Sequence, residues 1–211
     1  MLENISVKEF IKELASEKPT PGGGGAAALS AALSAALNCM VLNFTVGKKK
    51  YNDYDEEIKK MIKESLKKSD KLKDYFLTGI DRDAEAFSKI IKSYKLPKDT
   101  EEEKIYRHES IQEASKFAAE VPENIAQNVN ELFELILISA KYGNKNLITD
   151  AAAAAIMADA AIETSILNIK INIGSINDIK TKEKLEKSCR NLIKSSKEWK
   201  EKILSEVYLN I

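Results

Sequence analysis

The sequence predicts an all-α fold: an elongated bundle of about six helices, built as one domain over residues 1–211. Prolines and glycines are rare, four and eight in the whole chain, and half of the glycines stand in a single run. Few residues therefore interrupt a helix, and long helices are expected. Over long stretches the apolar residues recur at steps of three and four, the period of a helix with one buried face. Aromatic residues make up only 7% of the chain, and no second β-rich segment exists with which a strand could pair.

The composition argues against several classes of function. The 33 basic and 33 acidic residues cancel, so no overall positive field marks a nucleic-acid-binding protein. Cys39 and Cys189 lie far apart among apolar neighbours and are expected to be buried thiols, as in a reducing compartment. One histidine and no close cysteine pair make a metal site unexpected. The charged first residues do not resemble a secretion signal, so we expect a cytoplasmic protein.

The first predicted helix covers residues 5–16, where five apolar residues fall on one face. Ser6 and Glu9 have the spacing of a capping box, in which each side chain bonds to the backbone N–H of the other. Pro19 ends this segment, because the residue before a proline is pushed out of the helical region.

The segment PTPGGGG, residues 19–25, opens the second predicted helix and is called the glycine turn. That helix is expected to reach about Val46, with Gly47 as its C-terminal cap. No charge occurs from Ala26 to Gly47, a length that could cross a bilayer. Polar residues interrupt the stretch, however, and alanine is weakly hydrophobic, so we expect a helix buried within the bundle. The interruptions are Ser30, Ser34, Asn38, Asn43 and Thr45.

The third predicted helix runs from about 53 to 94 without a proline. At 1.5 Å per residue its length is roughly 60 Å, more than the diameter of a small globule. Either Gly79 bends it or it projects into a partner subunit, which favours a dimer. The fourth helix is capped by Asp99 or Thr100, and Pro122 either kinks or restarts it.

Thr149 or Asp150 is expected to cap a second alanine-rich helix, which ends at Gly174. Residues 166–173 alternate like a strand, but helix or extended loop is favoured because no partner strand exists. An amphipathic helix over about 181–208 completes the chain. We expect the two alanine-rich helices to pair at the centre, because small side chains let backbones approach closely.

The glycine turn is the first candidate for chemistry. Free backbone N–H groups and the positive end of the dipole at a helix start attract a carboxylate, a phosphate or a developing oxyanion. The run lacks the form of a phosphate-binding loop and no strand precedes it, so a nucleotide site is not supported. A flexible linker is the competing interpretation. Against it stand the flanking prolines and the uncharged helix directly after the glycines.

Acidic residues in the segment GIDRDAEAF are candidate bases. Asp81 and Glu85 share one helix face, and Asp83 and Phe87 share the neighbouring one. Like charges at this spacing cost stability, so either water solvates them or a ligand compensates them. The functional interpretation is a general base or a partner for a cationic nitrogen. An exposed helix face is the alternative.

Further polar residues stand at helix ends or within apolar runs. The motif of Lys48, Lys49, Lys50 and Tyr51 either compensates the negative end of the uncharged helix or anchors a ligand carboxylate. Buried amides need partners, so they cap another helix or bind a hydrogen-bonding ligand. This second group is Asn144, Asn168 and Asn172, with Asp150 beside them. His108 has charged neighbours and is expected at the surface.

Taken together and in order, these segments resemble the cyclodeaminase/cyclohydrolase family. The motifs are PTPGGGGAAA, VGKKKY, DRDAEAF, KLPKDTEEEK, Val121-Pro122, YGN with TD shortly after, and LNIKINIGSINDI, over about residues 5–180. The family includes stand-alone bacterial methenyltetrahydrofolate cyclohydrolases and the C-terminal domain of formiminotransferase-cyclodeaminase. The resemblance implies an all-helical homodimer that binds a tetrahydrofolate derivative beside the glycine turn. Thr149 departs from it, since related sequences often have serine there.

The resemblance places folate contacts near Thr20 and the glycines Gly22, Gly23, Gly24 and Gly25. We expect the three lysines to hold the glutamate tail, and further substrate contacts from Tyr51, Asp150, Asn168 and Asn172. Asp81 or Asp83 is the expected base, and the start of the second helix and Asn144 are the expected donors to the adduct oxygen. We expect no metal and no cofactor beyond the tetrahydrofolate substrate.

The expected reaction is the hydrolysis of 5,10-methenyltetrahydrofolate to 10-formyltetrahydrofolate. The first alternative is a formiminotetrahydrofolate cyclodeaminase, which forms the methenyl compound with loss of ammonia. We favour the hydrolase because this module stands without a transferase domain to supply the formimino substrate. The second alternative is a non-catalytic, folate-binding helical module. No nucleic-acid or membrane partner is expected.

Overall fold

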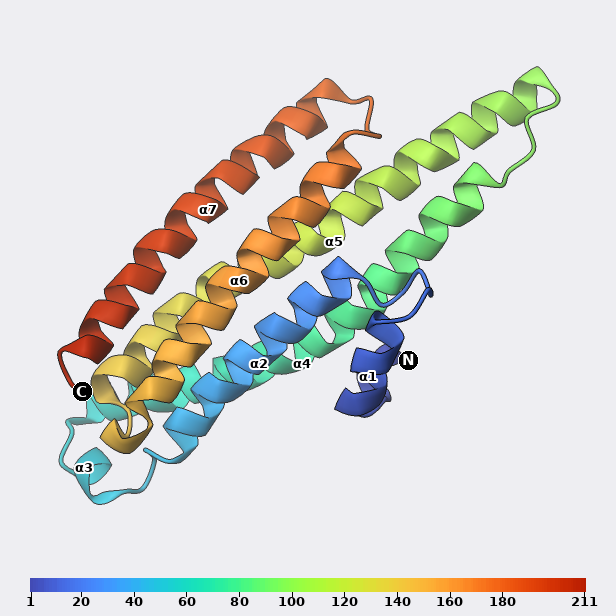
Figure 1. Ribbon diagram of the computed structural model, residues 1–211. Coiled ribbons are helices and arrows are strands. Elements are labelled where there is room, and N and C mark those ends of the chain that lie inside the picture. Colours follow the sequence, from blue (N-terminus) through green and yellow to red (C-terminus); the bar gives the residue numbers. More distant parts are fainter.

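The computed structural model describes residues 1–211 and contains helices but no strands, so the all-α prediction is confirmed (Figure 1). Seven α-helices occur, one more than expected, because a short helix forms within the lysine motif. They are α1 (Val7–Leu14), α2 (Gly23–Asn43), α3 (Lys49–Asn52), α4 (Glu56–Tyr94), α5 (Glu101–Tyr142), α6 (Ile148–Ile173) and α7 (Ile179–Tyr208). Short 3-10 turns cover Leu2–Asn4 and Lys145–Leu147.

The four long helices α2, α4, α5 and α6 form the body of the molecule, and α7 covers one side (Figure 1). α2 packs against α4 and α6, and α5 packs against the same two helices, so the four enclose one core. α7 packs on α5 and α6. The outer side of the α2–α6 layer carries no further helix (Figure 1). The core includes Phe76 of α4, Phe133 of α5 and Ile162 of α6, all fully buried.

The alanine-rich helices α2 and α6 pair at the centre, as predicted. Their inward alanines are almost completely buried, and the close approach lets small polar side chains bridge the two helices. The Ser30 hydroxyl donates to the backbone oxygen of Met157 at 3.0 Å, and the Ser34 hydroxyl donates to that of Ala154 at 2.7 Å. These bonds fix the register: the start of α2 lies beside the second half of α6.

The other polar residues of α2 also find partners inside the bundle. The Asn38 side chain donates to the Ser69 hydroxyl of α4 at 2.7 Å and accepts from the Ser139 hydroxyl of α5 at 2.5 Å. By length and composition, α2 and the segment Lys145–Ile173 could each cross a membrane, but 61% and 50% of their apolar windows are buried within the bundle. This burial is typical of core helices in a bundle.

Several local predictions are confirmed. Ser6 and Glu9 form a capping box, and Thr100 caps α5 through a second box with Glu103. The segment 166–173 is helical. Of the two alternatives for Pro122, a restart of the helix is wrong, because α5 is continuous through this buried residue.

Two predicted helix ends are wrong. α6 begins at Ile148, and its N-cap residue is Leu147, so neither Thr149 nor Asp150 caps it. The reason is the preceding 3-10 turn, which runs directly into α6 and makes the chain helical before it reaches those side chains. α2 ends at Asn43, three residues early, and Gly47 (φ 74°) lies in the turn that follows.

Gly79 lies within α4 at a point of close helix packing. α4 continues through it without interruption. A Cβ atom at this position would lie 3.3 Å from Cδ1 of Ile125 and 3.4 Å from Cβ of Ala28. Gly79 therefore allows α2, α4 and α5 to approach one another closely.

The predictions for the thiols and for the histidine are confirmed. Cys39 and Cys189 are free and buried, and burial, with Asp70 adding to it, raises the pKa of the Cys39 thiol to about 11. His108 is exposed and contacts the side chain of Asn177. It lies on the first half of α5, on an element that carries no other predicted site residue.

Candidate functional site

The glycine turn leads the chain into the positive end of α2. Gly22 is the N-cap residue in an extended conformation, and no side chain caps this helix. The first N–H groups of α2 therefore lack the usual side-chain partner. Thr20 is half-buried in the turn, whereas Gly24 and Gly25 are buried. The arrangement is that of an anion-binding helix start.

The Asp83 carboxylate of α4 lies against this helix start. A Cβ atom on Gly24 would overlap the carboxylate, so only glycine leaves room for it. The backbone N–H of Gly25 interacts with the carboxylate and favours its charged form. Burial raises the pKa of the Asp83 carboxyl, and the interaction with Gly25 opposes this rise. A carboxylate with a raised pKa, fixed at a helix start, is a candidate proton acceptor.

Asp81 has quite different surroundings from Asp83. Its Oδ1 accepts a hydrogen bond of 2.6 Å from the backbone N–H of Leu2, and its Oδ2 accepts a longer one of 3.5 Å from that of Glu3. The carboxylate thus ties the first residues of the chain to α4. The two aspartates were equivalent candidates in the sequence, but only Asp83 faces the glycine turn.

Asn168 of α6 flanks the glycine turn from the other side. A Cβ atom on Gly23 would lie 3.4 Å from its Nδ2 and 3.6 Å from its Oδ1. Nδ2 donates to the backbone oxygen of Thr164 at 2.9 Å, so Oδ1 is the end of the side chain that remains available to a ligand at the turn. Asn172 instead donates to the backbone oxygens of Ala118 and Asn168. It fastens α6 to α5 and does not line the turn.

The lysine motif forms a second cluster at the opposite end of α2. A pocket of about 280 Å³ lies there, and no carboxylate lines it. We call it the lysine pocket. It is lined by Lys48, Lys49, Lys50 and Lys145 together with Phe44, Thr45, Tyr51, Tyr142, Gly143 and Asn144. Lys145 was missed in the sequence, although it directly follows the YGN motif.

The lysine pocket has the electrostatics of an anion site. Burial lowers the pKa of Lys145, the neighbouring Lys50 cation lowers it further, and only Glu206 opposes them. The Tyr51 hydroxyl is buried and has no hydrogen-bond partner. A bound anion would relieve both the crowding of cations and the unsatisfied hydroxyl.

Asn144 and Asp150 lie at this same end. The Asn144 amide donates to the backbone oxygen of Phe44 at 3.2 Å, and its Oδ1 accepts from the backbone N–H of Asn146 at 3.0 Å. Both ends of this side chain are therefore engaged with the backbone. Asp150 is half-buried in the first turn of α6, where a negative charge complements the helix dipole.

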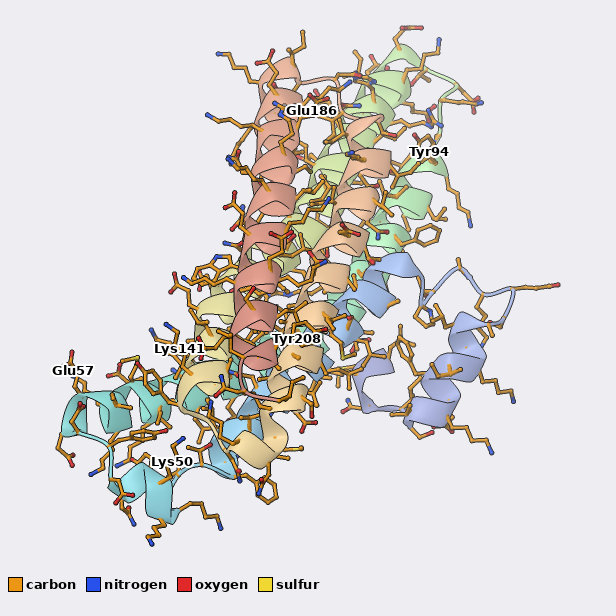
Figure 2. All side chains as sticks on the ribbon, turned by 60° about the vertical axis from the view of Figure 1, so that its left-hand side comes forward. Lys50, Glu57, Tyr94, Lys141, Glu186 and Tyr208 are labelled. Carbon is orange, nitrogen blue, oxygen red and sulfur yellow. The ribbon has the colours of Figure 1, made fainter.

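The predicted site residues thus fall into two groups, one at each end of α2. The helix has 21 residues, so its ends are about 30 Å apart. Lys50 lies at the opposite end of the bundle from Tyr94, the last residue of α4 (Figure 2). One chain does not bring all the candidates into one cleft. The sequence already indicates this separation, because an uncharged helix of that length lies between the glycines and the lysines.

Two larger pockets, of about 440 and 370 Å³, lie in the groove between α4 and α5. One of their lysines has partners within the groove. The Lys89 ammonium pairs with Glu85 at 2.9 Å and lies 4.0 Å from the centre of the Phe117 ring. No residue of the glycine turn lines either pocket, so we place the candidate site at the ends of α2.

Comparison with known proteins gives three consistent matches. A model of the formiminotransferase-cyclodeaminase family matches residues 6–191. The chain is 39% identical to the methenyltetrahydrofolate cyclohydrolase of Methylorubrum extorquens, over 98% of both proteins. It is 32% identical to the formimidoyltransferase-cyclodeaminase of Gallus gallus, over 90% of this chain but only 34% of that protein. The chain therefore spans about a third of the length of this second relative.

The fold has a close counterpart among solved structures. The formiminotetrahydrofolate cyclodeaminase of Thermotoga maritima superposes with a TM-score of 0.86, at 28% identity, over 99% of this chain and 98% of that one. The family resemblance seen in the ordered motifs is thus confirmed, and it extends over nearly the whole chain.

Proposed function

We propose that this chain, which belongs to the formiminotransferase-cyclodeaminase family, hydrolyses 5,10-methenyltetrahydrofolate to 10-formyltetrahydrofolate. The observation that carries the proposal is the end-to-end similarity to the cyclohydrolase of Methylorubrum extorquens. The position of Asp83 at the glycine turn supports it, because the reaction needs a base beside a helix start.

The chemistry is an addition followed by an elimination. The methenyl carbon lies between N5 and N10 and shares their positive charge. A water oxygen bonds to this carbon as the water gives up one proton, and a neutral tetrahedral adduct forms. The adduct hydroxyl then gives up its proton as the bond from the carbon to N5 breaks, N5 takes a proton, and the formyl group stays on N10. The site must therefore accept two protons in turn, return one to N5 and hold the adduct oxygen.

Asp83 is the base in this proposal. Its raised pKa makes it a better proton acceptor than an ordinary aspartate, and its negative charge stabilises the cationic substrate. The uncapped N–H groups of Gly23 and Gly24 are the donors to the adduct oxygen. Asp81 is less suited to this role, because its oxygens accept bonds from backbone N–H groups. The Oδ1 atom of Asn168 faces the same turn and is placed to bind the pterin.

The lysine pocket is the site for the glutamate carboxylates of the substrate, since it offers four cations and no competing acid. Asn144 contributes to its shape rather than to catalysis, because its amide is engaged with backbone. We also propose a cytoplasmic homodimer that requires no metal and no cofactor beyond the folate. Nucleic acid and membrane are not among its proposed partners.

A formiminotetrahydrofolate cyclodeaminase is the second candidate. The similarity of fold to the Thermotoga maritima cyclodeaminase favours it. There N10 attacks the formimino carbon, ammonia leaves, and the methenyl compound forms. That solved chain has nearly the same length as this one, so chain length does not separate the two reactions.

Parallel assays of the purified protein with both folates test the proposal. We expect the methenyl absorbance to decay with enzyme and no ammonia to be released from the formimino substrate. Ammonia release without methenyl hydrolysis would select the cyclodeaminase. Folate binding without either reaction would select the non-catalytic module.

A further inference from the structure

The face of α4 that carries Asp83 continues past the start of α2. Ile80 and Asp83 of this face both lie against the first turn of α2. A Cβ atom on Gly25 would lie 3.8 Å from Cγ2 of Ile80, and one on Gly24 would overlap the carboxylate. Phe87 follows Ile80 by seven residues and Asp83 by four, so it belongs to the same face. At this level α4 runs on beyond the start of α2 (Figure 1).

The Phe87 ring is therefore open to solvent beside the glycine turn. Ile80 is 3% exposed under α2, whereas Phe87 is 39% exposed. Four residues of a helix rise about 6 Å, so Phe87 stands about one turn from Asp83. A single exposed aromatic residue is ordinary in a folded protein. What distinguishes this one is its position next to the proposed base.

The Phe87 ring also differs from its neighbours in having no cation over it. The Lys89 ammonium lies 4.0 Å from the centre of the Phe117 ring on α5. Tyr94, seven residues beyond Phe87 on α4, has the Arg107 guanidinium at 5.7 Å from its ring centre. No lysine or arginine of the chain lies over Phe87. Its electron-rich face is free for a cation from outside the chain.

We propose that Phe87 binds the cationic ring system of 5,10-methenyltetrahydrofolate by stacking against it. The inference rests on the proposed function. In this substrate N5, the methenyl carbon and N10 share one positive charge within a five-membered ring that is fused to the pterin. A carbon attacked by a water on Asp83 lies about two hydrogen-bond lengths, or about 6 Å, from the carboxylate. A ring one helical turn from Asp83 is thus within reach of the charge, since cation–π attraction acts over about 6 Å.

Phe87 and Asn168 then bind different parts of the substrate. Asn168 on α6 offers its Oδ1 atom to the polar edge of the pterin, whereas Phe87 on α4 offers a flat apolar surface to its face. The ring attracts the positive charge without being able to take a proton. It therefore adds affinity for the charged substrate and much less for the 10-formyl product, which has lost that charge. In this inference Phe87 determines specificity for a cationic folate.

The binding of one charged and one uncharged folate tests the proposal. In the Asp83→Asn background turnover is slow, so Kd can be titrated for 5,10-methenyltetrahydrofolate and for 5-formyltetrahydrofolate, in which the one-carbon unit is a neutral amide. Adding Phe87→Leu should raise the Kd of the methenyl compound about tenfold, the factor that corresponds to about 1.4 kcal/mol. The Kd of the 5-formyl compound should rise much less. Adding Phe87→Trp instead should preserve the affinity for the methenyl compound, because indole is the best ring for a cation.

Tyr94→Leu in the same background is the matched control. Tyr94 lies on the same face of α4 and is 49% exposed, but its ring already has Arg107 over it. Its position is about 16 Å along the helix from Asp83. This change should leave both Kd values as they are. An equal rise of the two Kd values for Phe87→Leu, or no rise in either, overturns the proposal.

Kinetics separate this inference from the proposed function. With Asp83 intact, Phe87→Leu should raise KM for the methenyl compound about tenfold and lower kcat less, because the tetrahedral adduct has no positive charge for the ring to hold. If wild type is active and Phe87→Leu changes neither Kd nor KM, the inference fails while the function stands. If wild type turns over neither folate, the function fails, and the two Kd values still decide whether Phe87 binds a cationic folate. If neither folate binds, both fail.

Discussion

The two ends of α2 present opposite kinds of candidate binding site. At its start the candidate binding groups belong to the backbone: glycines leave the N–H groups accessible, and one carboxylate with a raised pKa lies against them. Past its end the candidate binding groups are side chains: four lysines surround a pocket, and the pKa of Lys145 is lowered. The first end suits chemistry on a cationic carbon, and the second suits carboxylates. Changes at the first should lower kcat, and changes at the second should raise KM.

A large effect on kcat is expected from a methyl group at the glycine turn. Gly24→Ala would force the Asp83 carboxylate away from the helix start, and a displacement of about 1 Å can cost about a hundredfold in rate. Gly22→Ala is the matched control, because the nearest atom to its Cβ would be the Pro19 oxygen at 3.9 Å. Steady-state kinetics of both variants measure the difference. Equal kcat values would show that Asp83 does not need its present position.

At the other end of α2, removal of lysines should act on binding. Lys49→Ala/Lys50→Ala should raise KM by about tenfold for each 1.4 kcal/mol of lost interaction with carboxylate, while kcat stays within a few-fold. Lys194→Ala on α7 is the control, since that side chain is 79% exposed and far from the pocket. A fall in kcat without a change in KM would show that the lysine pocket does not bind the substrate.

The two aspartates allow a smaller test within one helix. Asp81→Asn should weaken the bonds to the backbone of Leu2 and Glu3 and lower the free energy of unfolding by about 1 kcal/mol. The same variant should keep kcat within a few-fold. Denaturant unfolding and kinetics measure both quantities on one sample. A large loss of kcat with unchanged stability would show that Asp81, and not Asp83, is the base.

Asp83→Asn should stabilise the fold, whereas Asp81→Asn should destabilise it. This is the smallest of the expected effects. Burial raises the pKa of Asp83 in the folded state above its ordinary value, with Gly25 opposing, so its ionisation weakens the fold as pH rises through that raised pKa. The variant should therefore melt higher than wild type near pH 7. The difference should vanish below the ordinary aspartate pKa of about 3.9, where both forms are neutral. Melting curves against pH measure this; a lower melting temperature at neutral pH would contradict it.

The helices could be predicted from the sequence because periodic apolar residues and capping side chains act locally. Ser6 and Thr100 cap their helices as expected. The start of α6 could not be predicted, because a 3-10 turn capped by Asn144 makes the chain helical before Thr149. The site residues were harder to predict than the helices. Asp81 and Asp83 have the same chemistry, and only the packing of residues 2–3 and of Gly24 against α4 distinguishes them.

The separation of lysines from glycines also arises from the fold rather than from any motif. Each motif indicates a folate contact by resemblance, and nothing in their order shows which contacts belong to one molecule of substrate. Helix length does show it, since 21 residues of α2 place the two groups about 30 Å apart.

The turnover of Asp83→Asn on 5,10-methenyltetrahydrofolate tests the central claim most directly. A general base contributes about 10²- to 10⁴-fold to a rate, so kcat should fall by at least about a hundredfold while the folate still binds with a Kd close to that of wild type. A kcat within a few-fold of wild type would contradict the assignment of Asp83 as the base at the glycine turn.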